Sequence, residues 1–389
     1  ETNGELIHMK MKHSLLALAV GAASSAAVVT PAVAGDVTVY GRAQVEVAAV
    51  SWQEEASEVT PGACDGDNIS VSDGCDGIDV TDNAMGRVGF KASEDLGNGM
   101  KGLAKFEFKA DTADGDSSGS ISLTKRETLV GLKAGWGQVE LGRLKSAYKY
   151  YGGVKYDPFV ATTLQARGNG GMSGQGAYGN STGLNGVQSG LNAYGHNSFL
   201  SDQIGYQYTS GPIKFRVTYG IQDGLGDYSL GVMYKAEKFE VFGAATGTGD
   251  KYSDGNNAAD NLKEFTSYKV GGAFKLGAHK FVLQYEGHDV TWEDPNANVD
   301  APAKDLSPTH LFVGWNMKMG KNTFVVQGGM FDSDFEGTTA NPNADATYAA
   351  VGIIHKFSKM TRIFGGYRMS DVDDKTSADV ISVGLRKDF

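Results

Sequence analysis

Apolar and polar residues alternate along most of this chain with a period of two, not with the 3.6-residue period of a helix. In the first such segment, apolar positions run in steps of two from Val37 to Ala49, and polar positions that include Arg42 and Glu46 fall between them. Such a strand has one apolar and one polar face, and it is long enough to cross a bilayer at a tilt. The pattern therefore predicts strands with one face toward water and the other toward an apolar environment.

The connections between the alternating segments are themselves alternately short and long. Turns such as Ala134–Gly137 and Leu276–Ala278 contrast with segments such as 51–83 and 146–201. Short turns at one end and long loops at the other are typical of an outer-membrane barrel, and an even number of strands leaves both termini at the periplasmic, short-turn end. We count sixteen segments, at roughly 36–50, 84–94, 100–110, 124–134, 137–145, 202–210, 212–222, 228–236, 239–248, 264–275, 279–289, 308–318, 322–332, 346–356, 361–370 and 378–389.

The predicted fold is all-β: a transmembrane 16-stranded antiparallel β-barrel with short periplasmic turns and long extracellular loops. A bilayer offers the backbone no water, so a sheet inside it must close on itself. A soluble β-sandwich would also show period two, but it rarely contains so many strands of ten or more residues.

The N-terminal residues follow a different pattern. Lys10 and Lys12 precede an apolar stretch from Leu15 to Val29, and the small residues of Ala32–Ala34 follow it. This order predicts a secretory signal peptide and export through the inner membrane. The predicted organisation is upstream residues 1–8, a signal peptide at 9–34 and one barrel domain at 35–389.

Composition and charge exclude several other classes of protein. The net charge is −11, which argues against nucleic-acid binding because that needs a basic surface. Export leads to an oxidising compartment, so Cys64 and Cys75 are predicted to form a disulfide that closes a short loop. The histidines have no ligand spacing, and the calcium-like run that begins at Asp332 has Asn343 at its twelfth position. We expect no metal and no cofactor.

Enzymatic activity finds no support in the sequence. The chain has no Gly-x-Ser-x-Gly nucleophile elbow and no His-Glu-x-x-His metal motif. Some outer-membrane barrels are lipases or proteases, but that reading needs a specific catalytic cluster on adjacent strands. We therefore expect a protein that is not an enzyme.

Several motifs, in order along the chain, resemble the Gram-negative general porin family. The sharpest is Gly86–Lys91 followed by Glu94–Gly99, which is similar to the family's second strand and first periplasmic turn. The resemblance covers the whole chain after the signal peptide in layout. The other motifs that carry it are Asp36–Arg42, Val130–Lys133, Gly137–Arg143, Asp157–Phe159 and Val383–Phe389.

The resemblance implies passive diffusion of small hydrophilic solutes and ions through a water-filled homotrimeric channel in the outer membrane. It also implies contact with lipid and lipopolysaccharide, and an assembly signal at Phe389 that the barrel-assembly machinery reads. The third long loop, at 146–201, is expected to fold into the barrel and narrow it. Three basic residues match the family's wall positions: Arg42, Arg87 and Arg143.

Charge at the expected constriction differs from the pattern of the family. The loop 146–201 contains one acid, Asp157, against Lys149, Lys155 and Arg167, so a mild anion preference is predicted. The candidate constriction residues are therefore the three arginines with Lys155 and Asp157. Arg143 shares its parity with lipid-facing Val139 and Leu141, which predicts a bulge at Gly142 that turns it inward.

Two features keep other functions open. The segment 51–83 has nine acids and no Lys or Arg, and it would attract cations if it lined the vestibule. It would otherwise be a solvated surface that binds divalent ions and lipopolysaccharide. The tyrosine-rich loop 146–201 favours a substrate-selective channel, for example for phosphate, sugars or aromatic acids, and the long acidic loops favour a surface or adhesion barrel.

Overall fold

The computed structural model describes eleven stretches of the chain: 35–53, 77–82, 86–110, 112–113, 124–173, 199–221, 228–247, 262–292, 304–334, 345–373 and 377–389. The barrel lies within the unit Val37–Phe389. The upstream residues 1–8, the signal peptide and the Cys64–Cys75 pair lie outside the described residues, so these three predictions stay untested.

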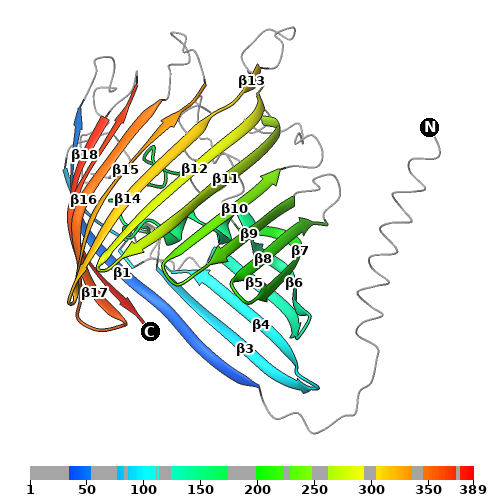
Figure 1. Ribbon diagram of the computed structural model, residues 1–389. Helices are drawn as coiled ribbons and strands as arrows, with labels where there is room; N and C mark the ends of the chain where they lie inside the picture. The colour runs from blue at the N-terminus through cyan, green and yellow to red at the C-terminus, as the bar shows by residue number, and fades with distance from the viewer. Residues whose placement is uncertain are drawn as a thin grey trace. The chain divides into compact units, whose positions relative to one another are not determined.

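The described strands form one antiparallel sheet in chain order that closes on itself (Figure 1). β1 pairs with β18 from Arg42↔Asp388 to Gln53↔Ser377, and it also pairs with β3. Two of the eighteen strands are short, β2 (Gly77–Thr81) and β13 (Lys304–Leu306). The other sixteen are β1 (Asp36–Gln53), β3 (Arg87–Gly97), β4 (Met100–Lys109), β5 (Thr124–Ala134), β6 (Gly137–Lys145), β7 (Phe199–Ser210), β8 (Ile213–Gly220), β9 (Tyr228–Lys235), β10 (Phe239–Gly247), β11 (Leu262–Leu276), β12 (His279–Trp292), β14 (Thr309–Met319), β15 (Asn322–Asp332), β16 (Ala346–Lys356), β17 (Thr361–Val372) and β18 (Ser377–Asp388).

These sixteen strands confirm the predicted barrel. β5, β6, β15 and β16 begin and end at the predicted residues. β7 begins three residues earlier than predicted and β12 continues three residues further, both at the long-loop end. There the strands pair beyond the stretch in which apolar and polar residues alternate, so the pattern underestimates their length.

The two faces of each strand follow the predicted alternation. In β1, Gln44 and Glu46 point into the barrel, and each is 1% exposed. The next residue, Val47, points outward and is 48% exposed. The exposed apolar side chains recur at every second position, for example Val351 and Ile353 in β16 and Ile381, Val383 and Leu385 in β18. Within the described residues, no helix has the length and apolar character needed to span a membrane.

The outward face gives a first testable prediction. Val313 lies in the middle of β14 and is 46% exposed on the outside of the barrel. Val313→Arg is expected to make the barrel folded in a bilayer less stable by about 2–4 kcal/mol, because a cation near the membrane midplane is poorly solvated. The measurement is urea titration of folding into phosphatidylcholine vesicles. Thr323→Arg, on the inward face of β15, is the matched control, and an equal loss in both variants would contradict the assigned faces.

Candidate functional site

A loop inside the barrel is the feature that defines the site. After β6 the chain forms α2 (Ala147–Tyr150) and the short helix η1 (Gly153–Lys155) inside the barrel (Figure 1), and then continues irregularly to Ser173. The Ser146 hydroxyl caps α2 by accepting a hydrogen bond from the Lys149 amide at 3.0 Å. Gly152 has φ 66°, and a side chain there would overlap Phe242 of β10. This glycine therefore permits the loop to turn against the wall. We call residues 146–173 the inserted segment.

Glu46 of β1 holds the middle of the inserted segment. Its carboxylate accepts hydrogen bonds from the Thr163 amide at 3.1 Å and from the Thr163 hydroxyl at 2.9 Å, and a third from the Ser382 hydroxyl of β18 at 2.7 Å. Close by, Arg368 of β17 donates to the Thr163 carbonyl at 3.1 Å and also to the Asn169 side chain. A buried carboxylate with three donors fixes the position of the backbone that it contacts.

Glu286 of β12 holds both ends of the inserted segment. It accepts hydrogen bonds from the Tyr148 hydroxyl at 2.8 Å and from the Ser173 hydroxyl at 2.5 Å. The neighbouring wall residue Gln284 accepts a bond from the Gly153 amide at 2.6 Å and donates to Glu286 at 2.7 Å. The segment is therefore tied to opposite sides of the barrel, because β1 and β12 are far apart in the sheet order.

Asp157 serves the same purpose from within the segment. Its carboxylate is 2% exposed and accepts bonds from the amides of Phe159 and Ala166, both at 2.8 Å, and from the Gln327 side chain of β15 at 2.8 Å. Burial raises the pKa of the Asp157 carboxyl, and these hydrogen bonds oppose that rise. Asp157 was predicted as a constriction residue, and in the structure its carboxylate oxygens hold the inserted segment in shape.

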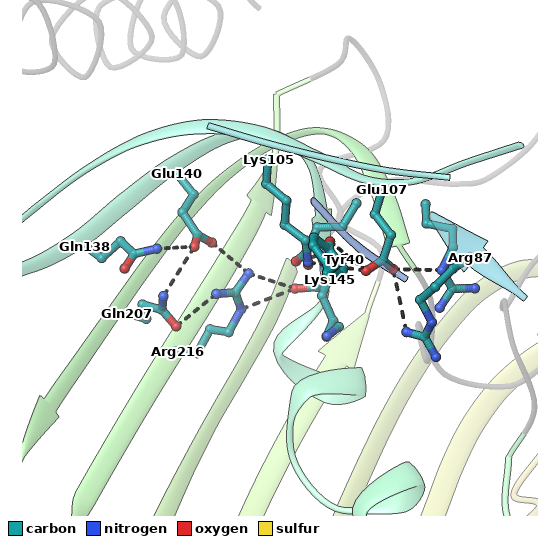
Figure 2. Close-up of polar contacts among 11 residues, drawn as sticks. Tyr40, Arg87, Lys105, Glu107, Gln138, Glu140, Lys145, Gln207 and Arg216 are labelled. Carbon is teal, nitrogen blue, oxygen red and sulfur yellow. Dashed lines mark hydrogen bonds and ion pairs between the residues drawn. The ribbon is translucent and has the colours of Figure 1, made fainter. Parts of the chain in front are cut away.

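A charged network lines the wall on β3–β5. Glu107 accepts hydrogen bonds from the Tyr40 hydroxyl at 2.9 Å and from Arg126 at 2.8 Å, and Arg87 lies 3.8 Å away. Figure 2 shows Glu107 beside Tyr40 and Arg87. Lys105 lies 3.7 Å from Glu107 and 2.5 Å from Glu127. Most of these residues lie on the inward polar faces of adjacent strands. Arg126 and Glu127 are consecutive, and both reach the network because the pairing of β4 with β5 shifts register beside them, between Phe106 and Phe108.

The network continues along the wall to β6 and β8. The Arg216 guanidinium forms an ion pair with Glu140 at 2.9 Å and donates to the Lys145 carbonyl at 3.0 Å (Figure 2). Gln138 and Gln207 also donate to Glu140, at 2.5 and 3.2 Å. Arg216 is 2% exposed, so its contribution is to fix Glu140 and the end of β6 in place.

On the other side of the network, arginines gather around one carboxylate. Asp388 accepts from Arg42 at 2.9 Å and from Arg386 at 3.2 Å. Arg362 of β17 is the direct cross-strand neighbour of Arg386, so two like charges face each other there. Among the described residues, these contacts join eight basic and four acidic side chains, so basic charge is in excess. The basic ones are Arg42, Arg87, Lys105, Arg126, Lys145, Arg216, Arg362 and Arg386, and the acidic ones are Glu107, Glu127, Glu140 and Asp388.

Arg143 is placed apart from Arg42 and Arg87. The pairing of β6 with β7 shifts register between Gly142 and Leu144, and Gly142 has φ 134°. The extra residue lies in β7, where Ser201 and Asp202 stand opposite Arg143 alone. β6 itself pairs with β5 without interruption through Thr128↔Arg143. Arg143 therefore keeps the parity of Leu141, and the structure does not show the predicted bulge in β6 that would turn it inward. The Arg143 guanidinium donates to the Ser201 hydroxyl at 2.9 Å, and among the described residues it has no ion pair.

The inserted segment adds cations of its own. Lys155 is exposed, and its Nζ lies 4.4 Å from the centre of the Tyr150 ring and 5.6 Å from that of Tyr151. Desolvation inside the barrel, with the nearby charges of Lys145 and Lys214, lowers the pKa of Lys155 to about 8. Burial also lowers the pKa of Arg167 to about 10. Among the described residues, no group of three or more His, Cys, Asp or Glu could hold a metal ion.

Comparison with known proteins agrees with this architecture. The family model described as Gram-negative porin matches residues 14–375, and the chain belongs to that family. It is 35% identical to the major outer membrane protein P.IB of Neisseria meningitidis serogroup A over 144 residues, which is 37% of the chain and 37% of that relative. It is 26% identical to a major outer membrane protein P.IB of Neisseria gonorrhoeae over 97% of the chain and 100% of the relative. The protein is thus an outer-membrane β-barrel.

The solved structures that resemble the chain share its fold. The anion-selective porin from Comamonas acidovorans has a TM-score of 0.67 at 17% identity, with 91% of this chain and 100% of that chain covered. OmpF of Salmonella typhi, in complex with daunomycin, has a TM-score of 0.62 at 15% identity, with 92% and 98% covered. At these identities, the likeness establishes the architecture alone.

Sequence reasoning found part of this site and missed part of it. Arg42 and Arg87 lie in the charged wall, and Lys155 faces the lumen from the inserted segment. Glu107, Arg216 and Glu286 were not singled out. Their signal was present, since each lies on the polar face of an alternating strand, but many polar residues share that property. Only the fold shows which of them meet.

Proposed function

We propose that the protein is a passive diffusion channel for small hydrophilic solutes and ions, with a mild preference for anions. The observation that supports this proposal is the inserted segment, which narrows a closed barrel beside a wall with excess basic charge. In a confined aqueous space, fixed charges of one sign raise the local concentration of the opposite ion. No bond chemistry is required, because the wall residues act through charge and the segment acts through size.

Arg42, Arg87 and Lys155 are the residues that we assign to anion preference. Arg42 and Arg87 are only partly compensated by Asp388 and Glu107, which they share with other basic groups. Lys155 has no ion pair among the described residues and is exposed. Asp157 is assigned to holding the segment, and Arg143 to a separate position on the wall.

Assembly as a homotrimer is part of the proposal. A related fold, OmpT of Vibrio cholerae, has been solved in a trimer form. The outward apolar faces would then contact neighbouring barrels as well as lipid, and Phe389 would serve the barrel-assembly machinery as the terminal signal. A mass measurement in mild detergent tests the assembly: three chains per particle are expected, and a monomer under all mild conditions would contradict it.

The channel itself is tested by swelling of liposomes that contain the purified protein. Small neutral sugars are expected to enter at rates that fall steeply with solute size, because the inserted segment sets a limiting width. Protein-free liposomes are the control. Correctly folded protein that admits no small sugar would overturn the proposal and would favour a surface or structural barrel.

A further inference from the structure

A second group of cations lies inside the barrel near the short turns. Its strand members are Lys214 of β8, Lys235 of β9, Lys275 of β11 and Lys280 of β12. They face inward, because the residues that alternate with them, such as Phe215 and Phe274, are exposed on the outside. Lys155 of the inserted segment is an electrostatic neighbour of Lys214 and Lys235. We call these five residues the lysine arc.

Strand pairing brings the members of the lysine arc close together. Lys275 and Lys280 are direct cross-strand partners, and Lys235 is paired with Glu240 of β10. Adjacent strands are about 4.8 Å apart, so the strand members of the arc, from β8 to β12, extend over about 19 Å of wall. Two aromatic rings of the inserted segment back the arc: Lys280 Nζ lies 5.2 Å from the centre of the Tyr156 ring, and Lys155 Nζ lies over Tyr150.

The positive charge of the arc is largely uncompensated. Lys235 has an ion pair with Glu240 at 3.6 Å. Within the stretches that the structure describes, the other four lysines have no ion pair. Five cations against one carboxylate leave four positive charges that face water in the barrel. This differs from the charged network around β1 and β3–β5, where Asp388 and Glu107 each contact two or more basic groups.

We propose that the lysine arc is a binding site for multivalent oxyanions, with phosphate chains as the chemical class. The inference rests on the proposed channel function and names a solute class that the channel holds. A single exposed ion pair contributes little, so a monovalent anion gains little here. A chain of linked phosphates can contact several lysines at once, and Lys is a suitable point charge for phosphate oxygens.

Lys155 makes this binding depend on pH in a defined direction. Its pKa of about 8 means that it is charged below pH 8 and neutral above it. The charged groups that face it are Lys145, Lys214, Lys235 and Glu240, with the Tyr150 and Tyr151 rings beside it. Raising the pH from 7 to 9 is therefore expected to remove one cation from the arc. Because a phosphate chain also titrates, Lys155→Met is the reference, and it should lack this component of the pH dependence.

The test is isothermal titration calorimetry of the full-length folded protein in detergent with sodium tripolyphosphate at pH 7. The variant K235M/K275M/K280M is expected to bind at least about tenfold more weakly, which is about 1.4 kcal/mol. The control K101M/K133M/K387M removes the same charge from exposed lysines near the same end of the barrel, outside the arc. It is expected to bind within about twofold of wild type, since distant sites act independently.

The outcomes distinguish failure of the proposed binding site from failure of the proposed channel. Unchanged tripolyphosphate affinity in K235M/K275M/K280M, or an equal loss of affinity in the control, would overturn the proposal that the lysine arc binds phosphate chains. Liposome swelling of the same preparations tests the channel separately. Wild-type protein that admits sugars but does not bind tripolyphosphate would refute the site alone, whereas protein that binds but admits no sugar would refute the proposed channel.

Discussion

Replacing Arg42 and Arg87 by glutamate is expected to reverse the ion preference of the channel from anions to cations. The change removes two positive charges and adds two negative ones beside the narrowed lumen. A unit charge about 10 Å from an ion changes its energy by about 0.4 kcal/mol in water. Four units therefore change it by about 1.7 kcal/mol, which is more than a tenfold change in the ratio of ion concentrations.

The measurement is the reversal potential of R42E/R87E in a planar bilayer under a KCl gradient. R42K/R87K keeps the charge and is expected to keep the sign of the wild-type potential. R42Q/R87Q removes two charges without adding like charges near Asp388 and Glu107, so it folds with less perturbation and should show about half of the shift. A wild-type potential in R42E/R87E would show that these arginines do not set the preference.

Removing the Glu46 carboxylate is expected to release the inserted segment. Glu46→Ala leaves the Thr163 amide and hydroxyl and the Ser382 hydroxyl without their acceptor. Each buried polar group left unpaired costs about 1–3 kcal/mol, so the segment loses a large part of its attachment to β1 and β18. We expect single-channel currents with frequent transitions between levels and closure at lower voltage.

Single-channel recording at increasing voltage tests this expectation. Glu46→Gln keeps one acceptor oxygen and should lie between wild type and Glu46→Ala. Glu94→Ala, in β3 near the first short turn, is the control for loss of a carboxylate elsewhere in the barrel. Quiet wild-type currents in Glu46→Ala would contradict the view that Glu46 fixes the segment.

The alternating pattern was sufficient to predict the barrel. Lipid requires an apolar outer face and water permits a polar inner one, so every strand carries the same two-residue signal. The pattern failed mainly at strand ends such as Phe199 and Trp292, where the strands pair beyond the stretch in which apolar and polar residues alternate.

The site was less predictable, because it depends on contacts between distant parts of the chain. Arg42 could be placed on the inner face from parity, and it lies there. Asp157 was predicted as a constriction residue from its position in the loop, and the sequence did not indicate its partners, which are two loop amides and Gln327, 170 residues further along the chain. Nothing in the local sequence indicates which wall strand a loop carboxylate will meet.

The proposed channel is open, and its narrowed lumen prefers anions. Its most direct test is the reversal potential of the wild-type protein in a planar bilayer under a tenfold KCl gradient. We expect large ohmic conductance and a potential whose sign shows that chloride is the more permeant ion. A potential of the opposite sign would show that other charges, such as those of the acidic segment 51–83, control permeation.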